Sequence, residues 1–194
     1  MSLVTNSQKK MLLFCGPSGS GKTTIVHYML TKDARLKFSV SATTRQKRNN
    51  EADGKDYHFI SVDDFRKKIS QNEFIEWEQV YENGYYGTLR NEVERILGVG
   101  KVPVFDLDVE GGQSIKKQFG EKVLALFVCP PDIEELKHRL TKRATETEES
   151  LKIRLDKAIY EMTHAEMFDK ILININKDEA YAQAEKWVNE FLSK

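Results

Sequence analysis

The sequence predicts an α/β fold in which helices flank a parallel β-sheet. Short apolar runs alternate along the chain with segments of helical periodicity, which is typical of this class. A glycine-rich turn joins the first apolar run to the first helical segment. The length of 194 residues provides for one well-buried core that carries at most a small inserted subdomain.

Four apolar runs are expected to form the sheet. They lie at residues 11–15, 102–106, 123–128 and 171–173. Their apolar residues do not alternate with polar ones, so each run is predicted to be a strand buried on both faces.

Three helices follow from the pattern of the remaining sequence. The glycine-rich turn opens a helix at residues 22–30. Segment 147–168 carries apolar residues at spacings of three and four, which predicts an amphipathic helix, and the end of the chain repeats the pattern. The residues expected to face the core are Leu151, Leu155, Ala158, Ile159, Met162, Ala165, Ala180, Ala184, Trp187, Val188 and Phe191.

Residues 38–87 interrupt this rhythm and are interpreted as an inserted subdomain. Segments 56–60 and 74–80 are expected to form short strands, and Asn83 with Gly84 is expected to form a tight hairpin turn. The core then comprises residues of about 9–37, 88–138 and 155–194.

Composition restricts the partners. The 30 basic and 30 acidic residues cancel, so no overall field favours a nucleic acid polymer or a membrane surface. No apolar stretch has the length of a membrane span or signal peptide. Cys15 and Cys129 lie in apolar runs and are expected to be buried thiols in a reducing compartment, which favours the cytoplasm. The histidines lack metal-ligand spacing, so a metal ion is expected to arrive with a phosphate.

The most informative motif runs from Gly16 to Thr23 and matches the pattern G-x-x-x-x-G-K-[ST]. It follows a predicted buried strand and opens a helix, so its backbone N–H groups can surround phosphates at the positive end of the helix. Lys22 is expected to reach the β- and γ-phosphates, and Thr23 to bind Mg²⁺. The predicted ATP-binding residues of this segment are Gly16, Pro17, Ser18, Gly19, Ser20, Gly21, Lys22, Thr23 and Thr24. The alternative is a glycine-rich turn without a ligand.

Asp106 ends a predicted strand and is a candidate metal ligand through a water molecule. An aspartate in this position is also common as a turn or cap residue.

Several further segments resemble the guanylate kinase family. They are residues 38–48, Glu51, residues 54–57, 74–77, 85–88 and 106–108, Pro130-Pro131 and residues 145–150. The resemblance extends from Leu12 to about Phe191, with the motifs in the expected order.

This resemblance implies a P-loop NTPase-type sheet with an inserted mixed α+β GMP-binding subdomain at residues 38–87 and a helical lid at about 139–154. It implies transfer of the γ-phosphoryl group of ATP to GMP or dGMP with Mg²⁺. The lid arginines Arg139, Arg143 and Arg154 are implied catalytic residues together with Lys22 and Arg45. Asn174 is implied near adenine, although Ile175 replaces the acidic residue that commonly follows. The implied GMP-binding residues are Ser41, Arg45, Arg48, Glu51, Tyr57, Glu76, Tyr86, Thr88, Asp106 and Asp108.

Guanine chemistry agrees with this assignment. The N1 and N2 groups of guanine are donors, so the carboxylate of Glu76 can accept two hydrogen bonds while Ser41 or Thr88 donates one to O6. Each residue also has an ordinary alternative. Arg45 and Arg48 could belong to a solvated basic turn, and Glu76 could be an exposed strand residue.

Two rival functions remain. One is a binding module that keeps the fold as a docking surface, although such modules typically have a damaged phosphate loop. The other is a kinase of the same fold that acts on another phosphorylated small molecule, such as a ribose bisphosphate. The sequence does not define the oligomeric state.

Overall fold

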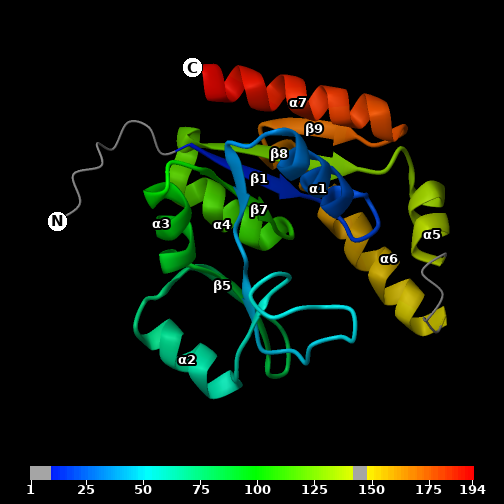
Figure 1. Ribbon diagram of the computed structural model, residues 1–194. Helices are drawn as coiled ribbons and strands as arrows, with labels where there is room; N and C mark the ends of the chain where they lie inside the picture. Colours follow the sequence, from blue (N-terminus) through cyan, green and yellow to red (C-terminus); the bar gives the residue numbers. More distant parts are fainter. Residues whose placement is uncertain (1–9, 142–147) are drawn as a thin grey trace. The chain divides into compact units, whose positions relative to one another are not determined.

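The computed structural model describes residues 10–141 and 148–194 (Figure 1). These residues divide into two compact units, which are described separately. The loop unit comprises residues 10–34 and 106–194, and the hairpin unit comprises residues 35–105.

The loop unit is built on three parallel strands. They are β1 (Met11–Cys15), β8 (Val123–Cys129) and β9 (Lys170–Ile173). Met11 pairs with Val123, and Leu126 pairs with Lys170. Together with β2 (Leu36–Phe38) and β7 (Val102–Asp106) they form a five-stranded sheet in the order β2-β7-β1-β8-β9. This confirms the predicted class.

Helices cover the strands of the loop unit. They are α1 (Lys22–Lys32), α4 (Val109–Phe119), α5 (Ile133–Thr141), α6 (Glu148–Met162) and α7 (Lys177–Ser193). A short 3₁₀ helix η1 (Gly120–Lys122) follows α4. Helices α1 and α7 pack together, while α4 packs on β1 and β8 (Figure 1). A Cβ at Gly112 would lie 2.1 Å from Cys15 Sγ, so α4 reaches this distance from β1 only because residue 112 has no side chain.

Two expectations for the loop unit are wrong in part. Strand β9 is not buried on both faces, because it lies at the edge of the sheet and leaves Ile171 41% and Ile173 55% exposed. The predicted helix at 147–168 ends at Met162 and is followed by a 3₁₀ helix η2 (Ala165–Met167). The Thr163 hydroxyl and His164 Nδ1 both approach the carbonyl oxygen of Tyr160, which provides a side-chain partner for the end of α6.

The apolar face of α6 packs mainly as predicted. Ala158 is buried with Leu136 and Leu140 of α5, and Leu151, Leu155 and Met162 pack against them. Ile159 is the exception, since its side chain is exposed. Helix α7 buries Ala180, Ala184 and Val188.

The hairpin unit contains a second, mixed sheet of strand order β4-β3-β6-β5. Its strands are β3 (Ala42–Thr43), β4 (His58–Phe59), β5 (Phe74–Tyr81) and β6 (Gly84–Leu89). Helices α2 (Val62–Ser70) and α3 (Arg90–Gly98) complete the unit. Its core surrounds Phe65 of α2, whose ring stacks on that of Phe74 with centroids 4.3 Å apart.

The hairpin turn differs from the prediction by one residue. Asn83 has the expected positive φ of 58°, but Gly84 already belongs to β6 and pairs with Tyr81. The loop is therefore Glu82-Asn83. Position 84 requires glycine for a steric reason and not for the turn, because a Cβ there would lie 2.2 Å from a ring carbon of Tyr81.

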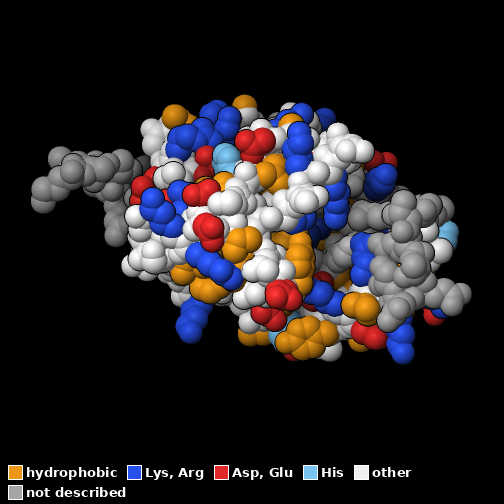
Figure 2. All heavy atoms as spheres, turned by 90° about the horizontal axis from the view of Figure 1, so that it is seen from below, with side chains coloured by type: hydrophobic (Ala, Val, Ile, Leu, Met, Phe, Trp, Pro, Cys, Tyr) orange, Lys and Arg blue, Asp and Glu red, His pale blue; other side chains and the backbone are white. Residues whose placement is uncertain are grey.

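The surface charge and the two cysteines match what the composition predicts. Acidic and basic side chains are interspersed over the face shown in Figure 2. Both Cys15 and Cys129 are buried free thiols, as expected. Among the described residues, no helix has the length and apolar character that crossing a membrane requires.

Candidate functional site

The predicted phosphate loop is a strongly curved turn between β1 and α1. Gly19 and Gly21 have φ angles of 91° and 92°, a region that L side chains rarely adopt. Gly16 lies so close to β8 that a Cβ would be 2.2 Å from the carbonyl oxygen of Val128. The backbone at these positions thus requires glycine, and the loop leads directly into the N-terminus of α1, where backbone N–H groups favour an anion.

Asp106, at the end of β7, binds both polar side chains that follow the loop. Its Oδ1 lies 2.7 Å from Lys22 Nζ, and its Oδ2 accepts a hydrogen bond of 2.7 Å from the Thr23 hydroxyl. Burial lowers the pKa of Lys22, but Asp106 more than offsets this, so the pKa is raised and the ammonium remains charged. The structure therefore groups Asp106 with the two residues expected to meet phosphate and Mg²⁺.

Asn174 and Arg139 both hold the backbone of the loop. The buried side chain of Asn174 donates from Nδ2 to the carbonyl oxygen of Ser20 at 2.7 Å. Arg139 of α5 donates to the same oxygen at 3.3 Å and to the Asn174 carbonyl oxygen at 3.0 Å. Its Nε bonds to Glu135 at 2.7 Å. Asn174, expected near adenine, thus supports Ser20 next to Gly21.

Of the other two arginines assigned to the lid, the structure describes only Arg154. Arg154 of α6 donates to the Ser18 hydroxyl at 2.6 Å, so one of these cations contacts the phosphate loop directly. Arg143 lies outside the described residues. Thr24, the last predicted residue of the loop, is exposed in the first turn of α1.

Sequence reasoning missed two residues of α6 near Asp108. Lys157 Nζ lies 3.6 Å from Asp108 Oδ2 and 3.7 Å from Glu161 Oε1. Asp108 also caps α4, since its Oδ1 accepts from the Gly111 amide at 3.0 Å. Burial raises the pKa of Glu161, although Lys157 opposes the shift. The spacing of Lys157 and Glu161 by four residues was the available sequence signal.

Within the hairpin unit, Glu51 fixes Arg45. Arg45 forms two hydrogen bonds to the Glu51 carboxylate, at 2.6 and 2.5 Å, and Glu51 also accepts from the backbone amide of Arg48 at 2.9 Å. The guanidinium carbon lies 4.9 Å from the ring centroid of Tyr57, which contacts the ring of Tyr86 edge to face. Two of the arginines and two of the tyrosines predicted to bind a phosphate are thus neighbours.

The pair formed by Arg45 and Glu51 predicts a pH effect on stability. The hydrogen bonds from Arg45 lower the pKa of Glu51 from 4.5 to about 2, so the pair stabilises the fold fully above pH 4.5. This contribution is lost as the pH falls from 4.5 toward about 2. We expect Glu51→Gln to lower the urea midpoint at pH 7, and the deficit to shrink between pH 4.5 and 3. A deficit that is constant with pH would contradict the assignment.

Glu76 and Thr88 form a buried polar pair on β5 and β6. Both side chains are buried, and the Thr88 hydroxyl donates to Glu76 Oε1 at 2.6 Å. The backbone of Ser41 accepts from the His58 amide at 2.9 Å, which fixes the segment before β3. Glu76 is therefore not an exposed strand residue. A carboxylate can accept more than one hydrogen bond.

The predicted residues fall into two groups. The loop unit contains the predicted ATP-binding residues together with Asp106 and Asp108, and the hairpin unit contains the other predicted GMP-binding residues. In the hairpin unit the contacts join Arg45 with Glu51 and Tyr57, and Glu76 with Thr88.

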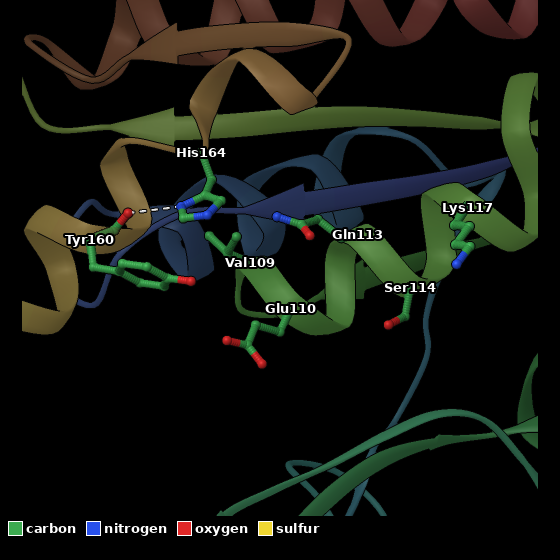
Figure 3. Close-up of a pocket in the computed structure, with 7 residues that line it drawn as sticks. All are labelled: Val109, Glu110, Gln113, Ser114, Lys117, Tyr160 and His164. Carbon is green, nitrogen blue, oxygen red and sulfur yellow. Dashed lines mark hydrogen bonds between the residues drawn. The ribbon is translucent and has the colours of Figure 1, made fainter.

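A separate hollow of about 350 Å³ lies between α4 and the end of α6 (Figure 3). Residues of α4 line it on one side, and Tyr160 and His164 close one end. None of its residues belongs to the predicted site, and the mixed charge of Glu110 and Lys117 indicates no particular ligand class.

Comparison with known proteins places these features in context. A family model described as guanylate kinase matches residues 8–191. The guanylate kinase of Bacteroides thetaiotaomicron is 48% identical over 185 residues, which cover 95% of this chain and 91% of that protein. The guanylate kinase of Porphyromonas gingivalis is 45% identical, over 95% of this chain and 99% of that protein.

Solved structures agree. The crystal structure of guanylate kinase from Anaplasma phagocytophilum superimposes with a TM-score of 0.78 at 26% identity, covering 97% of this chain and 89% of that one. The crystal structure of TT1252 from Thermus thermophilus, at 15% identity and a TM-score of 0.53, shares the fold and covers 96% of this chain and 99% of that one.

Proposed function

Because the chain belongs to the guanylate kinase family, and so to the nucleoside monophosphate kinases, we propose that it transfers the γ-phosphoryl group of ATP to GMP or dGMP. The observation that supports GMP as the acceptor is the buried pair of Glu76 and Thr88. A buried carboxylate can accept from N1 and N2 of guanine, whereas adenine presents an acceptor at its N1. Thr88 already donates to Glu76, so it helps to orient the carboxylate.

The proposed reaction needs no strong general base, because the attacking phosphate oxygen of GMP is already anionic. The protein has to bring two anions together and neutralise their charge. We assign the γ-phosphate to Lys22 and the loop amides, with Arg139, Arg143 and Arg154 as further cations. The phosphate of GMP is assigned to Arg45, Arg48, Tyr57 and Tyr86, with Glu51 holding Arg45 in place.

Magnesium fits the oxygen donors at the start of α1. Within residues 10–141 and 148–194, no group of three or more His, Cys, Asp and Glu side chains is arranged to hold a metal ion. The hydroxyl of Thr23 and the carboxylate of Asp106 are hard oxygen donors, and Mg²⁺ commonly uses one or two such groups together with phosphates. When bound with ATP, the ion would neutralise charge on the transferring phosphates.

The rivals are less well supported. A docking module has no need of Lys22 and Thr23 together at a loop whose glycines the backbone requires. A kinase of another small phosphate compound would not need a buried carboxylate paired with Thr88, although carboxylates also bind ribose hydroxyls. We further propose a cytoplasmic location, which the two buried free thiols support.

A steady-state assay of ADP formation tests the proposal. We expect a rate that depends on both Mg²⁺ and GMP, with kcat/KM for AMP lower by about 10³-fold or more because of the polar mismatch at Glu76. CMP and UMP should also be poor acceptors. Equal kcat/KM values for AMP and GMP would refute the assignment of guanine, and ADP formation without any acceptor would indicate an ATPase.

A further inference from the structure

Tyr81 is the last residue of β5 and has no role among the residues assigned above. Its side chain is 51% exposed. In a regular strand, side chains alternate between the two faces, so an odd-numbered residue of β5 would face away from Glu76. Unbroken alternation along β5 would therefore point Tyr81 away from the acceptor site.

A β-bulge reverses this direction. Gln79 pairs with Tyr85, but Tyr81 pairs with Gly84, so Val80 and Tyr81 together oppose a single step of β6. Directly paired residues share a face of an antiparallel sheet. Tyr81 therefore lies on the face of Gly84 and, by alternation along β6, of Tyr86.

The residues assigned to the acceptor lie on that same face. The pairs Glu76 with Thr88 and Glu78 with Tyr86 share the register that precedes the bulge. Gly84 provides the position for the phenol ring, because a Cβ at residue 84 would lie 2.2 to 2.4 Å from three ring carbons of Tyr81. The bulge and the glycine together determine where the ring lies.

The groups nearest this face of the hairpin belong to the predicted phosphate site, since the ring of Tyr57 contacts both Tyr86 and the guanidinium of Arg45. Burial raises the pKa of Tyr81, and the charge and hydrogen bond of Tyr86 raise it further, while Arg45 and Arg48 act in the opposite direction. The phenol consequently remains a donor at neutral pH. The pKa of Arg45 is raised chiefly by its hydrogen bonds to Glu51, and Tyr86 raises it further.

We propose that Tyr81 is a positioning residue for the phosphate of the acceptor nucleotide. In this proposal its hydroxyl binds the side chain of Tyr86, which together with Arg45 lies against the ring of Tyr57, and so holds Tyr86 in the orientation that binds the phosphate. The phosphate of a nucleoside monophosphate offers only acceptors when fully ionised, which suits a set of phenol and guanidinium donors. This inference rests on the proposed function, because it takes GMP as the acceptor.

The first test is Tyr81→Phe, which removes the hydroxyl and keeps the ring on Gly84. We expect KM for GMP to rise by about 3- to 10-fold, the effect of one neutral hydrogen bond, with kcat and KM for ATP unchanged. Inhibition by guanosine, which lacks the phosphate, should keep its Ki. Tyr160→Phe is the matched control, since Tyr160 is 53% exposed and lies on α6 in the loop unit, and it should behave as the wild type.

The second test combines Tyr81→Phe with Tyr86→Phe. If Tyr81 acts through Tyr86, its removal has little further effect in the Tyr86→Phe background, whereas independent effects that multiply would overturn the proposal. An unchanged KM for GMP in Tyr81→Phe, or an equal change in the Ki of guanosine, would also overturn it. If the wild type itself shows no GMP-dependent ADP formation, the proposed function fails instead. An unchanged Tm in each variant confirms that the hairpin has folded.

Discussion

The variant Lys22→Ala is expected to lower kcat/KM by about 10³-fold or more while the protein remains folded. Lys22 is the cation at the start of α1, and Asp106 keeps it charged despite burial. In the reaction the Lys22 ammonium would stay beside the transferring phosphoryl group. There it would offset the negative charge that accumulates as the two nucleotides approach. The loss should therefore appear mainly in kcat, which steady-state kinetics with saturating GMP will measure.

The same substitution should reduce stability, because it leaves the half-buried carboxylate of Asp106 without its cation. Adding Asp106→Asn to Lys22→Ala removes this unpaired charge, so the double variant should recover part of the lost stability and none of the activity. Lys32→Ala, at the exposed end of α1, is the control for loss of a lysine from this helix. Activity of Lys22→Ala close to that of the wild type would contradict the phosphate-loop mechanism.

Local patterns predicted most of the sheet. Strands β1 and β7 have the predicted bounds, and their apolar runs are buried because helices and neighbouring strands cover them. Strand β9 has a similar composition, yet both of its isoleucines are exposed. Its place at the edge depends on strand order, which composition does not encode.

The candidate site was predictable to the extent that its residues are close in sequence. The phosphate loop and its glycines follow from one short motif, whose backbone angles agree. The contacts of Asn174 with Ser20 and of Lys157 with Asp108 join segments far apart in the chain. The direction of Tyr81 depends on a bulge whose register no local pattern reveals.

The variant Glu76→Gln is expected to have the second large effect, which concerns recognition of the acceptor nucleotide and not the phosphoryl transfer step. The carboxylate is buried and accepts from Thr88 at 2.6 Å. An amide has one acceptor oxygen, so its NH₂ group would face Thr88 or a guanine N–H and leave a buried polar group unsatisfied. We expect kcat/KM for GMP to fall by about 100-fold, which corresponds to about 2.7 kcal/mol.

The choice between GMP and AMP tests the role of Glu76 more specifically than the fall in kcat/KM for GMP does. Because the amide can donate to N1 of adenine, Glu76→Gln should raise AMP use relative to GMP, while KM for ATP stays constant. Glu94→Gln on the exposed face of α3 removes a carboxylate from the same unit and should change neither acceptor. Equal losses for GMP and AMP would mean that the substitution disturbs the hairpin sheet, and an unaltered GMP dependence would remove Glu76 from the guanine site. A shift in the ratio of the two acceptors is the result that only direct contact with the base produces.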